Sequence, residues 1–424
     1  MAIQEDGVST TGRNWAGNYA YQATRLHEPA SLDELRAIVA RTPKIHTLGS
    51  RHCFNDIADS AELITLDGID QNLVIDREAM TVSMSAGIKY GDLAQALECE
   101  GLALHNMASL PHISVGGAVA TATHGSGDAN GNLSTAVAAL ELVTSEGDIV
   151  HLARGDEDFA GAVVNVGALG VVTRLTLDVQ PTFQVQQQVF EGLAWDVLYE
   201  NFDAITSSAY SVSLFIDYGE TVGQVWRKSR VDPQNPQEPL REFFGAPAAP
   251  LDRHPVPTLS AEGTTEQIGI VGAWADRLPH FRMDSVPASG NEIQTEFMVA
   301  RPYAIAAIKA VREIAPVIQP YLWVSEIRTV AADDFWLSSA YGTDTVCIHF
   351  SLRHDQEAVD RLLPIIEATL APFNPRPHWG KVFVATASDL EPRYERLSDF
   401  RNLASRLDPR GAFRNAYLDR HVFG

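Results

Sequence analysis

Hydrophobic positions in residues 1–180 follow two spacings, one helical and one extended. Residues 31–42, SLDELRAIVART, place aliphatic side chains on one side of a predicted helix, and Ser31 with Glu34 has the spacing of a capping box. A second helix is predicted at YGDLAQALECE, 90–100, and ends at Gly101. Short runs rich in Val, Thr and Leu predict strands at ELITL (62–66), NLVI (72–75), MTVSMSA (80–86), AVAALELVT (136–144), DIVHLA (148–153) and GVVTRLTLDV (170–179). This mixture is typical of an α+β domain and not of a regular βαβ repeat.

From residue 183 the segments become longer, and a proline-rich excursion occupies 231–259. Pro181 stops the preceding strand, so we place a domain boundary at 182/183. Strands are predicted at NEIQTEFMV (291–299), WVSEIRTVA (323–331), DTVCIHFSLR (344–353) and KVFVAT (381–386), and helices at YAIAAIKAVREIA (303–315) and QEAVDRLLPIIEATL (356–370). Alternating strands and amphipathic helices predict a sheet covered by helices on one face.

Composition narrows the class of protein. The chain has 424 residues, 45% of them hydrophobic, which favours two domains, and its formal net charge of -22 argues against nucleic-acid and membrane partners. Three scattered cysteines, Cys53, Cys99 and Cys347, suit neither a disulfide framework nor a zinc site. The polar N-terminus has no apolar signal region, and no later run reaches the length of a membrane span. We expect a cytoplasmic protein that acts on a small molecule, as a monomer.

Two loops are unusually rich in Gly, Ser, Thr and His: LGSRHCFND (48–56) and SLPHISVGGAVATATHGSG (109–127). Small residues allow a backbone to approach a large planar ligand that carries a pyrophosphate. Neither G-x-G-x-x-G nor the P-loop pattern occurs, which disfavours a nicotinamide-type fold and a P-loop. Tight turns with capping serines remain an equal alternative at this point.

Polar residues two apart on the predicted strands share a face. Three such pairs occur in the second half of the chain: Gln294 with Glu296, Glu326 with Arg328, and His349 with Ser351. Together they would form a floor for a hydroxyl-rich ligand, although a solvated strand face is the commoner explanation of any single pair.

Two other kinds of site find no support in the sequence. The pairs His46/His52 and His349/His354 lack compact zinc spacing, so we predict no metal. A Ser-His-Asp hydrolase is disfavoured because no G-x-S-x-G elbow is present.

Motifs along nearly the whole chain resemble one family. The chain contains, in order, RNWAGN, LGSRHCFND, GLALHNMASLPHISVGGAVATATHGSG, GALGVVT, SEIRTVAADDFWLS, RPHWGKVF and GAFRNAY. Together they resemble the alditol (xylitol) oxidases of the vanillyl-alcohol-oxidase flavoprotein superfamily. The resemblance implies an α+β fold with a two-subdomain FAD-binding domain at 1–182. It also implies a cap domain at 183–381, with a large antiparallel sheet flanked by helices, and a C-terminal segment at 382–424 that returns to the first domain.

The resemblance also implies FAD as cofactor, joined through the ring of His52 to the flavin 8α-methyl carbon. The residues that it places around FAD are His52, Thr47, Leu48, Gly49, Ser50, Arg51, Cys53, Ser109, Ser114, Gly117, Ala120, Thr121, Thr123, His124, Gly125, Gly170, Val172 and Asn415. Those placed around the substrate are Ser109, Gln294, Glu326, Arg328, His349, Ser351 and Lys381.

The implied reaction removes hydride from C1 of an alditol, such as xylitol, sorbitol or glycerol, to flavin N5, after which O2 reoxidises the flavin to give hydrogen peroxide. As catalytic roles we expect Lys381 to position the substrate and His349 to take the hydroxyl proton. We expect Arg328 to stabilise the anionic reduced flavin as a permanent cation, and Glu326 to bind the outer hydroxyls of the substrate. An aldonolactone oxidase or dehydrogenase is the alternative enzyme, and a non-catalytic flavin- or carbohydrate-binding protein is the alternative of another class.

The chain departs from the family pattern at four positions. Arg51 and Cys53 flank the linking histidine where Gly and Ser are common, His105 stands in place of a proline, and Ser351 in place of a threonine. We interpret Cys53 as a small filler beside the flavin and not as a second linkage.

Overall fold

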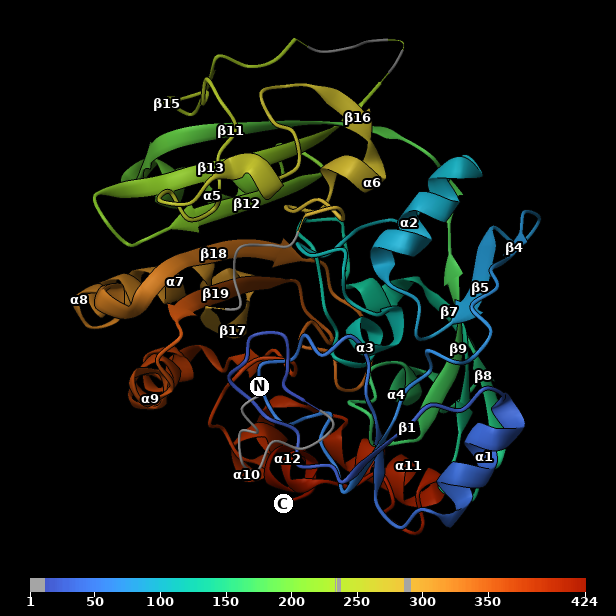
Figure 1. The fold of residues 1–424 in the computed structure, drawn as a ribbon. Helices are drawn as coiled ribbons and strands as arrows, with labels where there is room; N and C mark the ends of the chain where they lie inside the picture. The colour runs from blue at the N-terminus through green and yellow to red at the C-terminus, as the bar shows by residue number, and fades with distance from the viewer. Residues whose placement is uncertain (1–11, 233, 235–237, 286–290) are drawn as a thin grey trace, which may run out of the picture.

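A computed structural model describes residues 12–232, 234, 238–285 and 291–424 (Figure 1). The first eleven residues of the polar N-terminus and parts of the proline-rich excursion lie outside the described residues. Within the part of the chain that the structure describes, every helix is too short or too polar to cross a membrane.

The N-terminal unit begins with a three-stranded parallel sheet. Its order is β1 (Arg25–His27), β3 (Glu62–Ile64) and β2 (Ile45–Thr47), and α1 (Leu32–Arg41) buries its aliphatic side against the core. The predicted capping box is half confirmed. Ser31 Oγ accepts the Glu34 amide at 3.2 Å, but the Glu34 carboxylate accepts the amide of Ala30, because the chain before the helix turns that amide toward it.

A five-stranded antiparallel sheet completes this unit, together with three helices. Its order is β4 (Val74–Asp76), β5 (Thr81–Ser85), β9 (Val171–Asp178), β7 (Val137–Val143) and β8 (Ile149–Ala153). Burial alternates strictly along β9, which confirms the predicted half-buried strand. The helices are α2 (Tyr90–Cys99), α3 (Val115–Ala120) and α4 (Phe159–Val163); after α2 the chain turns at Gly101, where φ is +71°.

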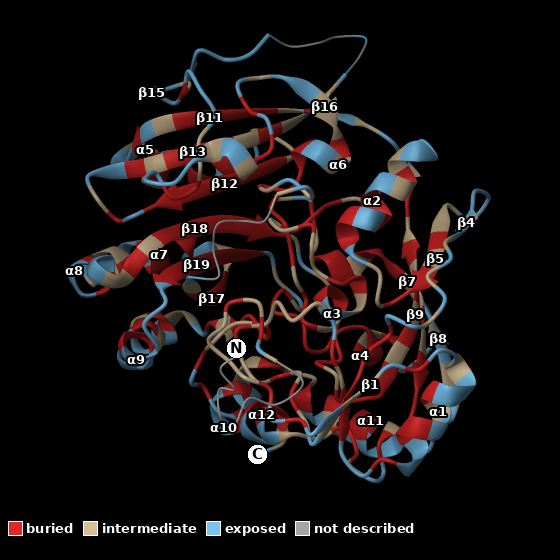
Figure 2. Cartoon of the chain, in the orientation of Figure 1, coloured by how far each residue is buried: buried red, intermediate tan, exposed pale blue. Residues whose placement is uncertain are grey.

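The second half of the chain forms an eight-stranded antiparallel sheet. Its order is β16 (Val271–Ala273), β11 (Gln184–Ala194), β13 (Thr221–Val231), β12 (Ser211–Ile216), β18 (Leu322–Val330), β19 (Thr345–Arg353), β17 (Glu292–Ala300) and β20 (Arg376–Pro377). The helix α5 (Trp195–Thr206) packs on β11 and β12, and α7 (Ala304–Glu313) and α9 (Gln356–Leu370) pack on β17. The predicted antiparallel cap sheet is confirmed. Of its central strands, β12 is buried along its whole length and β19 up to its last residue, Arg353, which is exposed (Figure 2).

Shorter elements connect these layers. They are the pairs β6 (Leu102–Ala103) with β10 (Gln180–Pro181) and β14 (Glu242–Phe243) with β15 (Ala246–Pro247), and the helices α6 (Trp274–Arg277) and α8 (Ala315–Ile318).

The strand predicted at 381–386 is wrong. This segment has no strand structure: the Val382 amide bonds to Gln294 O at 3.0 Å, but the Val384 amide turns to the side chain of Glu367 on α9. Phe383 is buried but Val384 is 44% exposed as the chain leaves the sheet, so the apolar run from Val382 to Ala385 did not reflect a ladder of hydrogen bonds.

The C-terminal segment returns to the N-terminal unit through α10 (Ala387–Leu390), α11 (Leu397–Leu407) and α12 (Ala416–Leu418) (Figure 1). The Ile45 amide donates to Ala412 O at 2.9 Å, so this segment extends the packing around β2. The strands of the eight-stranded sheet all lie between 184 and 377. The domain boundaries at 182/183 and 381/382 stay predictions.

Neighbouring residues on α9 give a matched test of this packing. Ile366 is fully buried between helix and sheet, whereas Ile365 is 38% exposed. We expect Ile366→Ala to lower the free energy of unfolding by about 2–5 kcal/mol and Ile365→Ala by less than about 1 kcal/mol. Denaturant unfolding of both variants measures the difference, and equal losses would contradict the orientation of α9.

Candidate active site

A cavity of about 760 Å³ separates the N-terminal unit from the eight-stranded sheet. The two glycine-rich loops line one side of it, and the polar face of β17, β18 and β19 lines the other. All the predicted substrate residues line this cavity: Ser109, Gln294, Glu326, Arg328, His349, Ser351 and Lys381. A volume of this size is in the range of cofactor and substrate sites.

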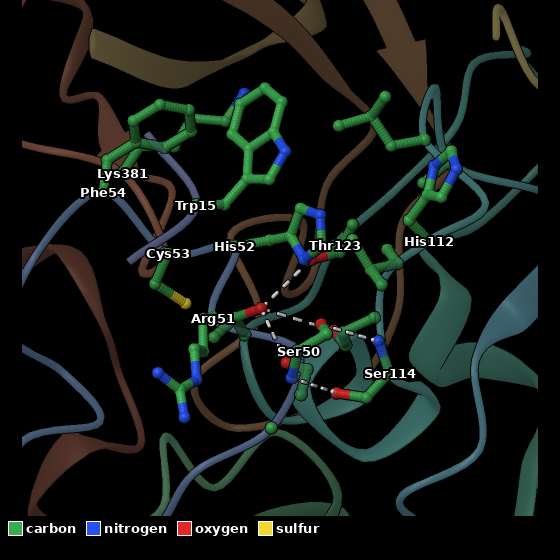
Figure 3. A pocket seen from close by; sticks show the side chains of 18 of the residues that line it. Trp15, Ser50, Arg51, His52, Cys53, Phe54, His112, Ser114, Thr123 and Lys381 are labelled. Carbon is green, nitrogen blue, oxygen red and sulfur yellow. Dashed lines mark hydrogen bonds between the residues drawn. The ribbon is translucent and has the colours of Figure 1, made fainter. Parts of the chain in front are cut away.

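The two glycine-rich loops are joined by a reciprocal pair of serines (Figure 3). The Ser114 amide donates to Ser50 Oγ at 2.9 Å, and the Ser50 amide donates to Ser114 Oγ at 3.4 Å. A Cβ atom on Gly49 would lie only 2.6 Å from Ser114 Oγ, so only glycine allows this approach. The serines therefore fix the two loops as one wall of the cavity.

His52 lies in this wall and stacks on the ring of Trp15, with 5.5 Å between centroids and 24° between planes. Burial, and then the neighbouring His112, lower the pKa of His52 to about 4. The imidazole is therefore neutral near pH 7 and retains a lone pair for nucleophilic attack.

A row of polar side chains crosses three strands of the opposite wall. In the register of the sheet, Glu296 on β17 lies beside His349 on β19, and His349 lies beside Glu326 on β18. Arg328 follows Glu326 by two positions and shares its face. The polar pairs predicted on three separate strands therefore lie side by side in the sheet.

Glu296 is the centre of this polar wall, and the sequence analysis did not assign it a role. Its carboxylate accepts Lys381 Nζ at 2.6 Å and Arg328 at 3.0 Å, and it lies 3.3 Å from His124. Burial alone would raise the pKa of Glu296, but Lys381 and Arg328 together hold it well below its usual 4.5. The pairing of Gln294 with Glu296 on one strand face was the only signal for it in the sequence.

His349, in the polar wall, and Lys381, on the chain that follows β20, both line the cavity. Burial, followed by the charge of Lys381, lowers the pKa of His349 to about 3, so its ring is neutral. In the described part of the chain, His349 Nδ1 is buried with no hydrogen-bond partner. Burial also lowers the pKa of Lys381, which Glu296 opposes. The neutral ring of His349, a candidate proton acceptor, therefore lies near the amino group of Lys381, which Glu296 holds in place.

A second acidic group closes the wall beyond His349. Glu292 accepts Ser351 Oγ and, at 2.8 Å, the amide of Gln294. The backbone oxygen of Ser109 on the facing loop accepts the amides of His280 at 3.1 Å and Phe281 at 3.2 Å. These contacts join loop and cap around a pocket that offers hydroxyl-binding groups.

Comparison with known proteins agrees with this geometry. A family model described as an FAD binding domain matches residues 23–153, and one described as D-arabinono-1,4-lactone oxidase matches residues 292–421. An alditol oxidase of Streptomyces sp. (strain IKD472 / FERM P-14339) is 46% identical over 416 residues, covering 97% of this chain and 99% of the relative. The chain belongs to the alditol oxidase family.

More distant relatives share the architecture. The L-gulono-1,4-lactone dehydrogenase of Mycobacterium tuberculosis (strain ATCC 25618 / H37Rv) is 27% identical and covers 98% of this chain and 100% of its own length. A solved cholesterol oxidase from B. sterolicum has a TM-score of 0.77 at 13% identity, covering 97% of this chain and 96% of its own. This structural likeness confirms the predicted flavoprotein fold.

The alditol oxidase family binds FAD, and the cavity of this member fits that cofactor. The predicted residues that line it are Thr47, Leu48, Gly49, Ser50, Arg51, His52, Cys53, Ser109, Ser114, Gly117, Ala120, Thr121, Thr123, His124, Gly170 and Val172. The close loop approach at Gly49 and the neutral His52 suit a large flat ligand with a reactive edge.

Two predicted cofactor residues are placed differently. Gly125 packs against the chain at Asn106 and Met107, where a Cβ atom would clash. Asn415 donates to Ile57 O and Asp59 O and caps α12, so it holds the C-terminal segment in place and lies outside the cavity lining. Gly125 and Asn415 therefore contact the chain outside the cavity lining.

The two unusual residues beside His52 have structural consequences. Arg51 has φ of +62°, a left-handed conformation that favours glycine, which explains why glycine is common at this position in the family pattern. Its backbone oxygen accepts the Trp15 amide at 2.8 Å, so it supports the ring that stacks on His52. Burial raises the pKa of Cys53 to about 12, and a neutral thiol agrees with its interpretation as a filler.

One set of side chains in this family member has the spacing of a metal site. The ligand atoms of His124, Glu296 and His378 lie within 4.8 Å of one another. Glu296, however, is already paired with two cationic groups, which would repel a metal ion. We therefore assign no metal to this cluster.

The ion-paired carboxylate gives a stability prediction. Glu296→Gln keeps the shape of the side chain but removes the buried counter-charge of Lys381 and one of the two carboxylates beside Arg328. We expect the free energy of unfolding near pH 7 to fall by about 3–5 kcal/mol.

The same variant should also change the dependence on pH. Because the folded-state pKa of Glu296 lies well below 4.5, its contribution is complete above about pH 4.5 and is lost as the pH falls further. The Tm of Glu296→Gln should therefore fall less on acidification from about pH 5 to 3.5 than that of the parent. Glu292→Gln is the control, since burial raises the pKa of that carboxyl. A parent-like acid slope in Glu296→Gln would refute the ion-pair assignment.

Proposed function

We propose that this protein oxidises the terminal C1 hydroxyl of alditols such as xylitol, sorbitol or glycerol to the aldose. The observation that carries the proposal is the row Glu296, His349 and Glu326, which faces a cavity otherwise lined by FAD-type loops. The carboxylates of Glu296 and Glu326 are balanced by the cations Arg328 and Lys381. A wall with this charge balance suits an uncharged substrate rich in hydroxyl groups. The 46% identity to an alditol oxidase supports the same substrate class.

The reaction removes a hydride and a proton from the alcohol. Bound FAD supplies the hydride acceptor at N5, and O2 takes up both electrons with two protons to form hydrogen peroxide. In this chain Lys381, held by Glu296, positions the reacting hydroxyl, and His349, which lines the cavity, accepts its proton. A weak base suffices, because the hydroxyl proton becomes strongly acidic as hydride leaves the carbon. Arg328 supplies a permanent cation, and Glu326 and Ser109 bind outer hydroxyls.

His52 is the proposed point of covalent attachment to the flavin. Its neutral, buried imidazole supports this role, and no second linkage is proposed. We further propose that the protein is cytoplasmic and monomeric.

A lactone oxidase or dehydrogenase is the second candidate. It is favoured by the match of residues 292–421 to a D-arabinono-1,4-lactone oxidase model. A non-catalytic flavin- or carbohydrate-binding protein is the third, and it predicts a flavin that polyols do not reduce.

Oxygen consumption distinguishes these candidates. The purified protein is assayed with xylitol, sorbitol, glycerol and a 1,4-lactone, and peroxide is measured in parallel. Peroxide formed one-for-one with O2 on polyols supports the proposal. Turnover on the lactone alone would assign the second candidate, and an unchanged flavin spectrum with all four compounds would assign the third.

The proton-accepting role is tested at His349. We expect His349→Ala to lower kcat about 10²–10⁴-fold with a smaller change in KM, because the base acts in the transition state. The flavin content confirms that the variant is folded. Near-normal turnover at saturating xylitol would exclude the role.

The linkage is tested on acid-precipitated protein. Yellow fluorescence should remain with the polypeptide of the parent and disappear from it in His52→Ala, because that variant has no imidazole to attach. Cys53→Ser is the matched control and should retain the fluorescence. Flavin that stays attached in His52→Ala would place the bond elsewhere.

A further inference from the structure

A buried lysine lies behind the substrate wall with no described carboxylate in hydrogen-bond contact. Lys228, on β13, is 1% exposed, and its Nζ donates to Leu278 O at 2.6 Å, to Pro279 O at 3.0 Å and to His280 Nδ1 at 3.2 Å. Three acceptors around one nitrogen match the three N–H donors of an ammonium group. A neutral amine would have only two donors for the same three partners.

The next residue in this chain of contacts reaches the cavity. His280 is 5% exposed and lines the cavity, and its Nε2 lies 3.0 Å from Glu326 Oε1. Because Lys228 donates to Nδ1, that nitrogen must carry the lone pair, and the ring proton must lie on Nε2, facing Glu326.

The proton shared by Lys228, His280 and Glu326 could lie on any one of these three groups. A proton on both ring nitrogens is disfavoured, since burial and Lys228 lower the pKa of His280 to about 4. A proton on Glu326 is disfavoured, since Arg328 and His280 overcome burial and hold the pKa of that carboxyl below its usual range. Burial lowers the pKa of Lys228 well below its usual value, and Glu326 opposes that shift. The geometry decides among the three groups: Nζ has three acceptors within 3.2 Å, which only an ammonium group satisfies in full, so we assign the shared proton to Lys228.

We propose that Lys228 and His280 are positioning residues that hold Glu326 as an ionised, oriented acceptor for a substrate hydroxyl. This deepens the proposed function and rests on the role given there to Glu326. Lys228 lies behind the cavity wall and acts only through His280, whose tautomer it fixes. His280 Nε2–H donates to Oε1 at 3.0 Å, and Arg328 Nε forms an ion-pair contact with Oε2 at 3.5 Å, so rotation of the carboxylate away from the pocket would lose both contacts.

The two residues therefore govern how well the enzyme recognises polyols. A carboxylate held from behind presents its remaining lone pairs in one direction, toward hydroxyls of the bound chain. A carboxylate without this support rotates or pairs more fully with Arg328. Substrates that use the hydroxyl contact should then lose affinity, while compounds without that hydroxyl should lose little.

The kinetic test compares Lys228→Met with Lys309→Met, a matched change at an exposed lysine on α7. For Lys228→Met we expect KM for xylitol to rise roughly 10-fold with little change in kcat, as when an aligned charge-assisted hydrogen bond is lost. The preference for xylitol over 1,5-pentanediol should shrink, because the diol lacks the inner hydroxyls. Equal losses on both substrates would show general loosening of the cap and would overturn the proposal.

Two substitutions at His280 separate hydrogen bonding from packing. The amide of His280→Gln can accept from Lys228 through its oxygen and donate to Glu326 through its nitrogen, whereas His280→Leu can do neither. We expect His280→Leu to reproduce the kinetics of Lys228→Met, and His280→Gln to recover most of the lost affinity. Equal kinetics in the two variants would contradict a role for the hydrogen-bonded chain.

The tautomer gives a readout that does not require turnover. In holoenzyme with ¹⁵N-labelled histidine, the signal missing from His280→Gln identifies His280, and near pH 7 it should show the Nε2–H form. Lys228→Met should change that pattern, and Lys309→Met should not. An Nδ1–H or doubly protonated ring in the parent would refute the proposal. If the Nε2–H form is found but no polyol is oxidised, the proposed function fails and the Lys228–His280 arrangement stands.

Discussion

The buried carboxylate of Glu296 is the interaction on which the active-site wall depends. Two cations, Arg328 and Lys381, approach it from different segments, one within the sheet and one from the chain that leaves it. Each of these charges would be costly to bury alone, and with the carboxylate of Glu326, which lies 3.5 Å from Arg328, two carboxylates balance the two cations. This balance allows a polar face to exist in the interior, next to an otherwise apolar core.

The remaining architecture supplies the two surfaces that this wall needs. Helices of the cap cover the opposite face of the eight-stranded sheet, so the polar face is the one left toward the N-terminal unit. The serine pair between the two loops fixes the other surface, and the C-terminal segment packs back on it. The cavity therefore lies between two rigid walls built from distant parts of the sequence, and FAD and substrate chemistry meet there.

The sequence was a poor guide where the local pattern of residues does not determine the hydrogen bonds or the surroundings of a side chain. Residues 381–386 form an apolar run typical of a strand, yet Phe383 packs against the rings of Tyr417 and His421, and the Val384 amide bonds to a side chain of α9. Asn415, expected beside FAD, donates to the backbone of Ile57 and Asp59 and lies outside the cavity lining, so its contact with the cofactor stays a prediction. Lys228 and His280 were not among the predicted site residues, because no strand was predicted around Lys228 and a lysine is usually exposed; only the fold shows that both are buried.

The sequence by itself determined the fold class, four of the longer helices (α1, α2, α7 and α9), the strands β3–β5, β7–β9 and β17–β19, the loop that presents His52, and the residues of each polar strand face; it did not show the long cap strands β11, β12 and β13. These depend on periodicity, on turn chemistry and on motifs contiguous in the chain. Only the tertiary structure decided that Glu296, His349 and Glu326 form one row, that Lys381 completes it, and that Lys228 supports it from behind. Strand register and the packing of one segment on another set these relations, and pKa shifts follow from the resulting burial, which no local spacing specifies.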